Sequence, residues 1–360
     1  MKYVDEFRDR RLIDKISRQI HNNVEAGRTY TFMEVCGTHT MAIFRFGLRG
    51  LLPANIRLIS GPGCPVCVTP NEFIDKAIAI SRRRDVIIAT FGDMLKVPGS
   101  RSSLEKEKAS GASIKTVYSS IDALAMARRN PDKEVVFLGI GFETTSPTVA
   151  QSILIAKKQK ITNYSVLCGH KTMPVALKIL TGRRSARLDG FLLPGHVSAV
   201  IGARDYEFLA KDAGKRCVIT GFEPLDILQA IFMLLKQDRP EVEIQYTRII
   251  NRDGNALARR AIDNVFEKCS SVWRGMGRIA GSGLKIRKGF ASFDAEARFK
   301  PKIAPPKEKK ACICGDVITG VKTPLECKLF AKACNPEHPA GACMVSSEGT
   351  CAAYHKYRRS

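Results

Sequence analysis

The chain contains 360 residues, of which 44% are hydrophobic and 26% are charged. This length suits two or three domains, and the composition excludes a disordered chain and a membrane-embedded body. Lysine and arginine outnumber aspartate and glutamate by 58 to 35, which gives a net charge of +23. No zinc-finger, stacking-aromatic or helix-turn-helix signature accompanies that charge, so a solvated basic surface is favoured over a nucleic-acid site.

The amino terminus and the apolar runs indicate where the protein resides. No apolar run approaches the roughly 20 residues of a membrane-spanning helix. The first segment, MKYVDEFRDRR, carries acids and bases where a signal peptide would be apolar. We therefore expect a cytoplasmic protein with no membrane partner. In that reducing compartment the 12 cysteines are expected to be thiols or metal ligands rather than structural disulfides.

The predicted elements begin with a helix and continue with alternating strands and helices. Residues 5–24 place apolar side chains at helical spacing, which predicts an amphipathic helix. Strands that are apolar on both faces and alternate with helices indicate parallel sheets covered by helices, so the predicted fold class is α/β. Eight β-branched-rich runs predict these strands, in order YTFMEV, IRLIS, DVIIATF, IKTVY, EVVFLGI, YSVLC, LDGFLLP and RCVIT.

The chain is expected to form two parallel-sheet α/β lobes and a small cysteine-rich region at the C-terminus. We place the first lobe at residues 1–128 and the second at 129–240, followed by a linker and the cysteine-rich domain at 241–360. The N-terminal helix is a candidate to pack on that last region. The Pro-rich segment KPKIAPPKEKK reads as the linker. We expect a monomer when the protein is alone.

The segment MEVCGTHTM places Cys36 directly after a predicted strand and His39 three residues later. A thiolate with an imidazole is a competent pair of ligands for iron, zinc or nickel. The alternative is a buried thiol and a histidine that caps the next helix.

The segment ISGPGCPVCVTPNEF contains a CxxC pair, Cys64 and Cys67. Thr69, Pro70 and Glu72 predict a capping box at the start of a helix directly after the pair. The partial positive charge of a helix amino terminus favours thiolates, the reactive form in disulfide exchange and metal binding. Redox or metal chemistry is therefore favoured over inert thiols.

Six cysteines occupy the C-terminal tail. Zinc ribbons present paired CxxC units, which this tail lacks. The wide and irregular spacing favours an iron–sulfur cluster wrapped by loops, which needs four thiolates. Zinc binding and free thiols are the alternatives. The tail cysteines are Cys312, Cys314, Cys327, Cys334, Cys343 and Cys351.

Polar residues in strand-to-helix loops complete the set of candidates. Such loops lie at the carboxyl ends of parallel strands, where open α/β sheets form binding crevices, although each side chain could simply satisfy turn or cap hydrogen bonds. A GxxxxGK[ST] loop is missing and GIGFET lacks the third glycine of a dinucleotide fingerprint, so neither nucleotide motif is supported. The loop candidates are Asp93, Glu143, Thr144, Thr145, His170, His196 and Glu223.

Together these motifs resemble the HypD family of nickel–iron hydrogenase maturation, or expression/formation, proteins. The resemblance extends from Glu34 to Tyr357 and is carried by EVCGTHT, SGPGCPVCVTP, GFETTSPT, CGHKTMP, PGHVSAVIG, TGFEPLDIL, CICGDVITG and CNPEHPAGACMVSSEGTCAAY. It implies an accessory assembly protein rather than an enzyme with its own turnover. Such a protein is a scaffold on which the iron centre acquires cyanide and carbon monoxide. It works with a HypC-type small chaperone and a HypE-type cyanide donor.

The resemblance also assigns roles to individual residues. Cys36 and His39 match the family's iron-site motif, and Cys64 and Cys67 match its redox dithiol. The spacing of the [4Fe–4S] ligands is best matched by Cys312, Cys327, Cys334 and Cys351, with Cys314 and Cys343 as alternates.

Three functional hypotheses follow. In the first, the cluster exchanges electrons with the dithiol, which supports iron binding or cyanide attachment at Cys36, while Glu143 and Thr144 orient ligands or protons. The alternative is a general iron–sulfur thiol-disulfide reductase in which Cys36 is incidental. The third is a zinc-stabilised basic protein that binds nucleic acid with salt-sensitive affinity.

Overall fold

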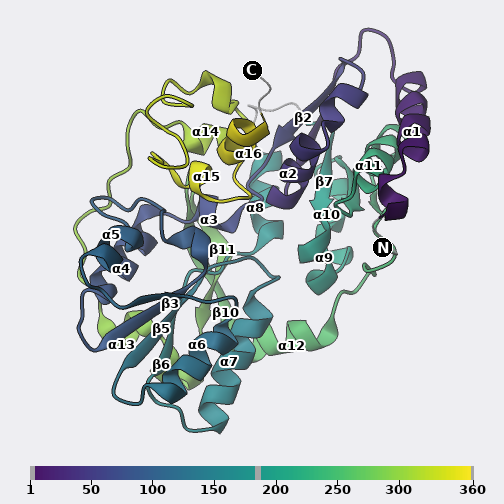
Figure 1. Ribbon diagram of the computed structural model, residues 1–360. Helices are drawn as coiled ribbons and strands as arrows, with labels where there is room; N and C mark the ends of the chain where they lie inside the picture. The colour runs from purple at the N-terminus through teal and green to yellow at the C-terminus, as the bar shows by residue number, and fades with distance from the viewer. Residues whose placement is uncertain (1–4, 183–187, 358–360) are drawn as a thin grey trace.

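The computed structural model describes residues 5–182 and 188–357 and is built on two parallel sheets (Figure 1). Sheet A has the strand order β2-β1-β7-β8-β9, and sheet B has the order β4-β3-β5-β6. Every pairing within the two sheets is parallel. The predicted α/β fold class is therefore confirmed.

All eight predicted strands are present, and the short strand β9 is an addition. The strands of sheet A are β1 (Tyr30–Glu34), β2 (Ile56–Ser60), β7 (Gly190–Pro194), β8 (Arg216–Thr220) and β9 (Val242–Ile244). The strands of sheet B are β3 (Val86–Thr90), β4 (Ile114–Thr116), β5 (Glu134–Gly139) and β6 (Tyr164–Cys168).

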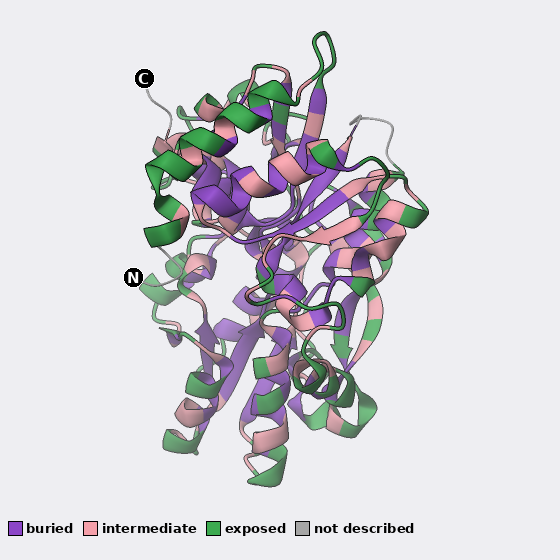
Figure 2. Ribbon diagram, turned by 90° about the vertical axis from the view of Figure 1, so that its right-hand side faces the viewer, coloured by how far each residue is buried: buried purple, intermediate pink, exposed green. Residues whose placement is uncertain are grey.

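Sheet A combines strands from two separate stretches of the chain. β1 pairs with β2 from its own stretch and with β7, which follows the whole of sheet B. The chain thus leaves sheet A after β2 and returns to it at β7. In Figure 2 the strands are buried over most of their length, whereas the outer helices carry exposed residues.

Helices cover both sheets, and their ends follow local sequence signals. The predicted N-terminal helix is present as α1, which Asp9 caps by accepting hydrogen bonds from the backbone of Arg11 and Leu12. The helices beside sheet A are α1 (Arg10–Asn22), α2 (Gly37–Arg45), α9 (Gly195–Ile201), α10 (Glu207–Lys211) and α11 (Pro224–Lys236). Those associated with sheet B are α4 (Asn71–Ser81), α5 (Leu104–Ala109), α6 (Ser120–Arg129), α7 (Ser146–Lys158), α8 (Met173–Thr181) and α12 (Ala256–Val265).

An antiparallel hairpin that the sequence did not predict lies beside β6. It consists of β10 (Phe266–Trp273) and β11 (Gly277–Ile286), and Lys171 bridges to Gly283 of β11. After the hairpin come η5 (Lys288–Phe293), α13 (Ala295–Phe299) and an extended segment.

The cysteine-rich tail packs on the loops that follow β1 and β2. Its helix α15 (Ala342–Val345) contacts the short helix α3 (Pro65–Val68), and α16 (Thr350–Tyr357) contacts α2. The rings of Phe44 and Tyr354 are 4.5 Å apart at the second contact. The tail also contains α14 (Cys314–Ile318) and η6 (Pro324–Glu326); the other 3-10 helices are η1 (Asp5–Arg8), η2 (Leu48–Leu51), η3 (Gly92–Met94) and η4 (Arg204–Tyr206).

One hydrophobic cluster runs through the centre of the protein. It contains Met33 of sheet A, Ile88 of sheet B, Cys67 of α3 and Cys343 of the tail. The tail is therefore part of the core. None of the helices in residues 5–182 and 188–357 combines the length and the apolar character that a membrane span requires.

Candidate functional site

Cys36 lies at the N-cap of α2, directly after the carboxyl end of β1. The residue is only 8% exposed. Burial, together with the negative charge of Glu348, raises the pKa of Cys36 to about 12, although hydrogen bonds from Thr38 and His39 oppose that rise. The free thiol is therefore protonated near neutral pH. A bound cation would favour the thiolate, since metal binding displaces the proton of a thiol ligand.

His39 is fully buried and neutral. Burial lowers its pKa to about 4. Its Nε2 lies 3.0 Å from the carbonyl oxygen of Gly221 and 3.3 Å from that of Thr220, so Nε2 carries the proton and donates. Nδ1 has no hydrogen-bond partner among the described residues. A neutral imidazole with one free nitrogen is the form that binds a metal ion.

Cys64 and Cys67 form a disulfide bond. Cys64 is the N-cap of α3, and its sulfur accepts a hydrogen bond from the backbone N of Cys67 at 3.1 Å. The two residues are 6% and 1% exposed. A disulfide on the surface of a large protein substrate would not reach a pair buried to this extent. The geometry therefore favours an exchange partner within this protein or a small-molecule thiol.

The capping box predicted after the CxxC pair is wrong. Pro65 starts the short helix α3, and Thr69 ends it and donates its hydroxyl to the carbonyl oxygen of Pro65 at 2.8 Å. The next helix, α4, follows Pro70 as its N-cap, and Glu72 forms an ion pair with Lys76. The proline inside the CxxC motif starts a helix earlier than the sequence pattern indicated.

The CxxC loop lies directly against the backbone of Cys36. A Cβ atom on Gly63 would collide with the N and Cα atoms of Cys36. The backbone N of Gly37 donates to the carbonyl oxygen of Gly63 at 3.1 Å, and that of Gly61 donates to Glu34 at 2.8 Å. The glycines of the SGPG segment therefore allow the disulfide loop and the Cys36 loop to share one backbone interface.

Glu348 from the tail covers the Cys36 loop. The hydroxyl of Thr38 donates to Oε1 of Glu348 at 2.8 Å, and a Cβ atom on Gly37 would collide with Glu348. Burial raises the pKa of Glu348. Glu348 belongs to no recognisable catalytic or metal-binding motif in the sequence, because only the fold brings SSEGTC next to EVCGTHT.

Asp93 connects the same tail loop to sheet B. Its Oδ2 accepts hydrogen bonds from the hydroxyl of Ser346 at 3.0 Å and from the backbone N of Ser347 at 3.2 Å. The loop that covers Cys36 is thus held by the carboxyl ends of strands from both sheets. Asp93 therefore positions the tail.

The six tail cysteines gather in one region. Side-chain hydrogen bonds join Cys312 to Cys314, Cys314 to Cys343 and Cys343 to Cys351. A separate hydrophobic cluster contains Cys327, Cys334 and Cys351, so Cys351 belongs to both groups. Within residues 5–182 and 188–357, no group of three or more His, Cys, Asp and Glu side chains is arranged to hold a metal ion. The donor set nevertheless fits the chemistry of an iron–sulfur cluster, which four thiolates bind.

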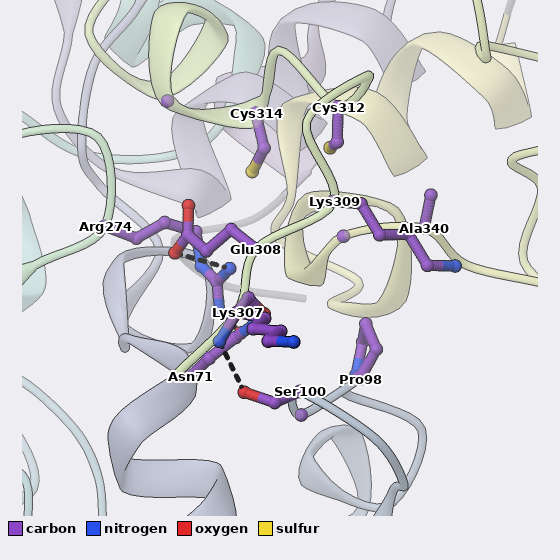
Figure 3. A pocket seen from close by; sticks show the side chains of 13 residues that line it. Asn71, Pro98, Ser100, Arg274, Lys307, Glu308, Lys309, Cys312, Cys314 and Ala340 are labelled. Carbon is purple, nitrogen blue, oxygen red and sulfur yellow. Dashed lines mark hydrogen bonds and ion pairs between the residues drawn. The ribbon is translucent and has the colours of Figure 1, made fainter. Parts of the chain in front are cut away.

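A small pocket of about 130 Å³ opens onto two of these cysteines (Figure 3). Cys312 and Cys314 lie on one side of it, and Arg274 and Glu308 lie across from them. The positive charge of Arg274 is within electrostatic range of both thiols. We name this cavity the cysteine pocket.

Arg274 is a buried link between the disulfide loop and the tail. Its backbone N donates to Val68 at 2.8 Å, and its guanidinium donates to the carbonyl oxygen of Thr69 at 2.9 Å and to Oδ1 of Asn71 at 2.7 Å. The next residue, Gly275, leaves no room for a Cβ atom against Gly315 of α14. The turn of the unpredicted hairpin is therefore inserted between α3 and the tail cysteines.

Glu143 is buried at the carboxyl end of β5, in a cavity of about 650 Å³. Its Oε1 accepts a hydrogen bond from the backbone N of Met173 at 2.9 Å, and Oε2 has no partner among the described residues. Tyr206 is within electrostatic range of both Glu143 and Cys36. Thr144 is exposed and does not line this cavity. Glu143, but not Thr144, thus faces the interior.

The stability of a Glu143→Gln variant should depend on pH differently from that of the wild type. Burial raises the pKa of Glu143 from 4.5 to about 7, so folding favours the protonated carboxyl group. The wild type therefore loses stability as the pH rises from about 4.5 through 7. The glutamine cannot ionise and should make the variant more stable at pH 8, by up to about 3 kcal/mol.

Urea unfolding at pH 5 and pH 8 measures this difference. The advantage of the variant should be smallest at pH 5. An advantage that stays constant between the two values would mean that the pKa of Glu143 is not raised.

The remaining loop candidates contact neighbouring protein groups and, within the part of the chain that the structure describes, form no common site with Cys36. His196 is exposed and stacks on Phe222 with ring centroids 4.0 Å apart, and His39 also stacks on Phe222, at 4.7 Å. The carboxylate of Glu223 accepts a hydrogen bond from Arg8 at 2.9 Å. The hydroxyl of Thr145 donates to the carbonyl oxygen of Phe142, and burial lowers the pKa of His170 to about 4.

Comparisons with known proteins give one consistent result. A family model described as HypD, the hydrogenase formation hypA family, matches residues 11–358. The chain is 49% identical to a hydrogenase maturation factor HypD of Cupriavidus necator, over 100% of this chain and 98% of that protein. It is 47% identical to the factor HypD2 of Bradyrhizobium diazoefficiens, over 100% and 97%. It is 45% identical to the factor HypD of Escherichia coli K12, over 100% and 99%.

Proposed function

The chain belongs to the HypD family of hydrogenase formation proteins, and from this premise we propose that it scaffolds the iron centre of nickel–iron hydrogenase while cyanide and carbon monoxide are attached. The proposed partners are a HypC-type small chaperone and a HypE-type cyanide donor. One observation carries the proposal: Cys36 lies directly against the disulfide loop and beneath the tail. This contact supports the proposal, because the thiol proposed to bind iron, the proposed redox pair and the proposed cluster ligands would then act in one region.

The iron under assembly is the substrate, and Cys36 and His39 are its proposed ligands. Iron that carries diatomic ligands is soft and accepts a thiolate well. The free Nδ1 of His39 offers a second donor, while Nε2 is fixed by the carbonyl oxygens of Thr220 and Gly221. Burial of Cys36 and His39 would limit the access of water to a bound metal.

The tail cysteines are the proposed ligands of a resident cluster, with Cys312, Cys327, Cys334 and Cys351 first and Cys314 and Cys343 as alternates. A [4Fe–4S] cluster bound there would supply single electrons. Helix α15, which carries Cys343, contacts helix α3, which carries Cys67, and this contact supports an electron route between the two thiol centres. Reduction of the Cys64–Cys67 disulfide consumes two electrons and two protons and yields two thiols.

Iron and acid-labile sulfide per chain, measured on protein purified without oxygen, test this proposal. We expect about four irons and four sulfides. Substitution of cluster ligands should lower both values, whereas Cys168→Ala and Cys269→Ala, which change cysteines outside the tail, should leave both unchanged. Any further iron that disappears in Cys36→Ala marks the assembly site. Stoichiometric zinc without sulfide would overturn both the cluster and the electron route.

The general reductase remains the competing function. It requires a disulfide that a protein substrate can reach, and the burial of Cys64 and Cys67 argues against that. The two functions also differ in their clients. Loss of function in Cys36→Ala with hydrogenase as the single affected client supports the scaffold, whereas disulfide reductase activity that survives this change supports the alternative.

A further inference from the structure

An extended segment, residues 300–310, runs along the outside of the molecule between α13 and α14, at the left edge of Figure 1. We name this segment the strap. It is held mainly through its backbone: the N of Lys307 donates to the hydroxyl of Ser100 at 2.8 Å, and its carbonyl oxygen accepts from Asn71 at 2.7 Å. Because the backbone makes these contacts, the lysine side chains of the strap are not needed to hold it in place.

The strap carries five lysines and one acid, and the acid is paired. Its one acid, Glu308, accepts a hydrogen bond from Arg274 at 3.2 Å and faces the cysteine pocket. Its lysines are exposed, and within residues 5–182 and 188–357 they form no ion pair. These lysines are Lys300, Lys302, Lys307, Lys309 and Lys310.

This basic surface borders the pocket that opens onto the tail cysteines. Lys307 and Lys309 line the cysteine pocket together with Cys312 and Cys314. A second cavity, of about 160 Å³, shares Ser100 and Lys307 with it and adds Arg101 and Lys302. The cysteine pocket and the adjoining cavity are therefore lined in part by lysine and arginine side chains without an acidic partner among the described residues, close to the thiols of Cys312 and Cys314.

We propose that the strap and Arg101 form the docking surface for an acidic one-electron carrier protein of the ferredoxin type. The inference rests on the proposed function, in which the disulfide must be reduced. Complementary charge steers such a carrier, and weak redox encounters use small polar interfaces of this kind. The strap carries no aromatic residue on which a base could stack, which favours an acidic protein over nucleic acid.

Reduction of one disulfide requires two electrons, so two one-electron carriers must bind in turn. Two reduced carriers each lose one electron and become oxidised. Two protons come from water, the Cys64–Cys67 bond breaks, and two thiols form. The tail cysteines that line the pocket are the part of the buried redox region that lies nearest to the docked carrier.

The test uses the full-length protein with its metal content intact and a reduced plant-type ferredoxin, whose low reduction potential makes it a competent donor. A strap variant carries Lys302→Glu, Lys307→Glu and Lys309→Glu. A matched control carries Arg11→Glu, Lys15→Glu and Arg18→Glu on the exposed face of α1, at the opposite edge of Figure 1. Calorimetry at two salt concentrations gives the affinity, and stopped-flow absorbance with a thiol assay gives the rate of disulfide reduction.

The strap variant should bind ferredoxin at least about tenfold more weakly and be reduced correspondingly more slowly, because rim charges govern association. The control variant should stay within about twofold of the wild type. Dithiothreitol, a neutral reductant, should reduce all three proteins at equal rates. Equal losses in both variants, or wild-type binding that is insensitive to salt, would overturn the docking surface.

Two outcomes separate the docking surface from the function on which it rests. Selective loss of binding in the strap variant, with no disulfide reduced in any protein, would support the docking surface and contradict the proposed electron route. Tighter binding of the strap to a random single-stranded oligonucleotide than to ferredoxin would overturn the proposal in favour of nucleic acid.

Discussion

Replacing Cys36 by serine is expected to reduce hydrogenase maturation by more than about 100-fold, since loss of even an outer-shell partner costs about 10–100-fold in metal affinity. A hydroxyl is a poor ligand for soft iron. The fold should survive, because serine keeps the size of the side chain and can still cap α2. Hydrogenase activity in a strain that lacks its own copy of the protein measures the effect, and thermal unfolding checks the fold.

Cys168→Ser and Cys269→Ser are the controls for this prediction. Both residues are partly buried cysteines outside the tail and away from the Cys36 loop. They should retain maturation activity. Wild-type maturation activity in the Cys36 variant would contradict the proposal that Cys36 binds the iron under assembly.

Replacing Gly63 by alanine should cause the second largest effect. The added methyl group would collide with the backbone of Cys36, which cannot move as a flexible side chain can. We expect a loss of about 1–3 kcal/mol in stability, as is typical of overpacking. Because the disulfide loop must shift away from Cys36, we also expect maturation to fall at least about tenfold, as small misplacements in catalytic and binding sites commonly do.

Gly50→Ala is the matched control for this change. An added Cβ at Gly50 meets no atom within 4 Å, so stability and maturation should stay near those of the wild type. If Gly63→Ala also behaved as the wild type, the close approach of the two loops would not matter for function. The melting temperature and the hydrogenase activity of both variants decide the question.

The strands could be predicted because each lies in a short, mostly apolar run with β-branched or aromatic residues, bounded by turn residues. The hairpin of β10 and β11 could not, since FEKCSSVW and GRIAGSGLKI show neither an apolar run nor a strict alternation of apolar and polar residues, and β11 contains glycines. The sequence also could not predict which strands belong to which sheet. The pairing of Phe32 with Gly190 depends on tertiary packing between distant segments, which no local pattern encodes.

The residues of the candidate site could be predicted where a short motif contains reactive side chains at a characteristic spacing. Cys36, Cys64 and Cys67 stand out by residue type and spacing alone. Gly63 and Glu348 do not, because their roles arise from the contact of one loop with another. Arg274 was missed for the same reason, and it lies in the turn of the hairpin that the sequence did not predict.

The infrared spectrum of the protein, purified without oxygen from cells that assemble hydrogenase, tests the central claim most directly. The scaffold account predicts stretching bands of metal-bound cyanide and carbon monoxide in the wild type. It predicts their loss in Cys36→Ser, with the iron and sulfide of the tail retained. Bands of equal intensity in both proteins, or no such bands in the wild type, would contradict the account.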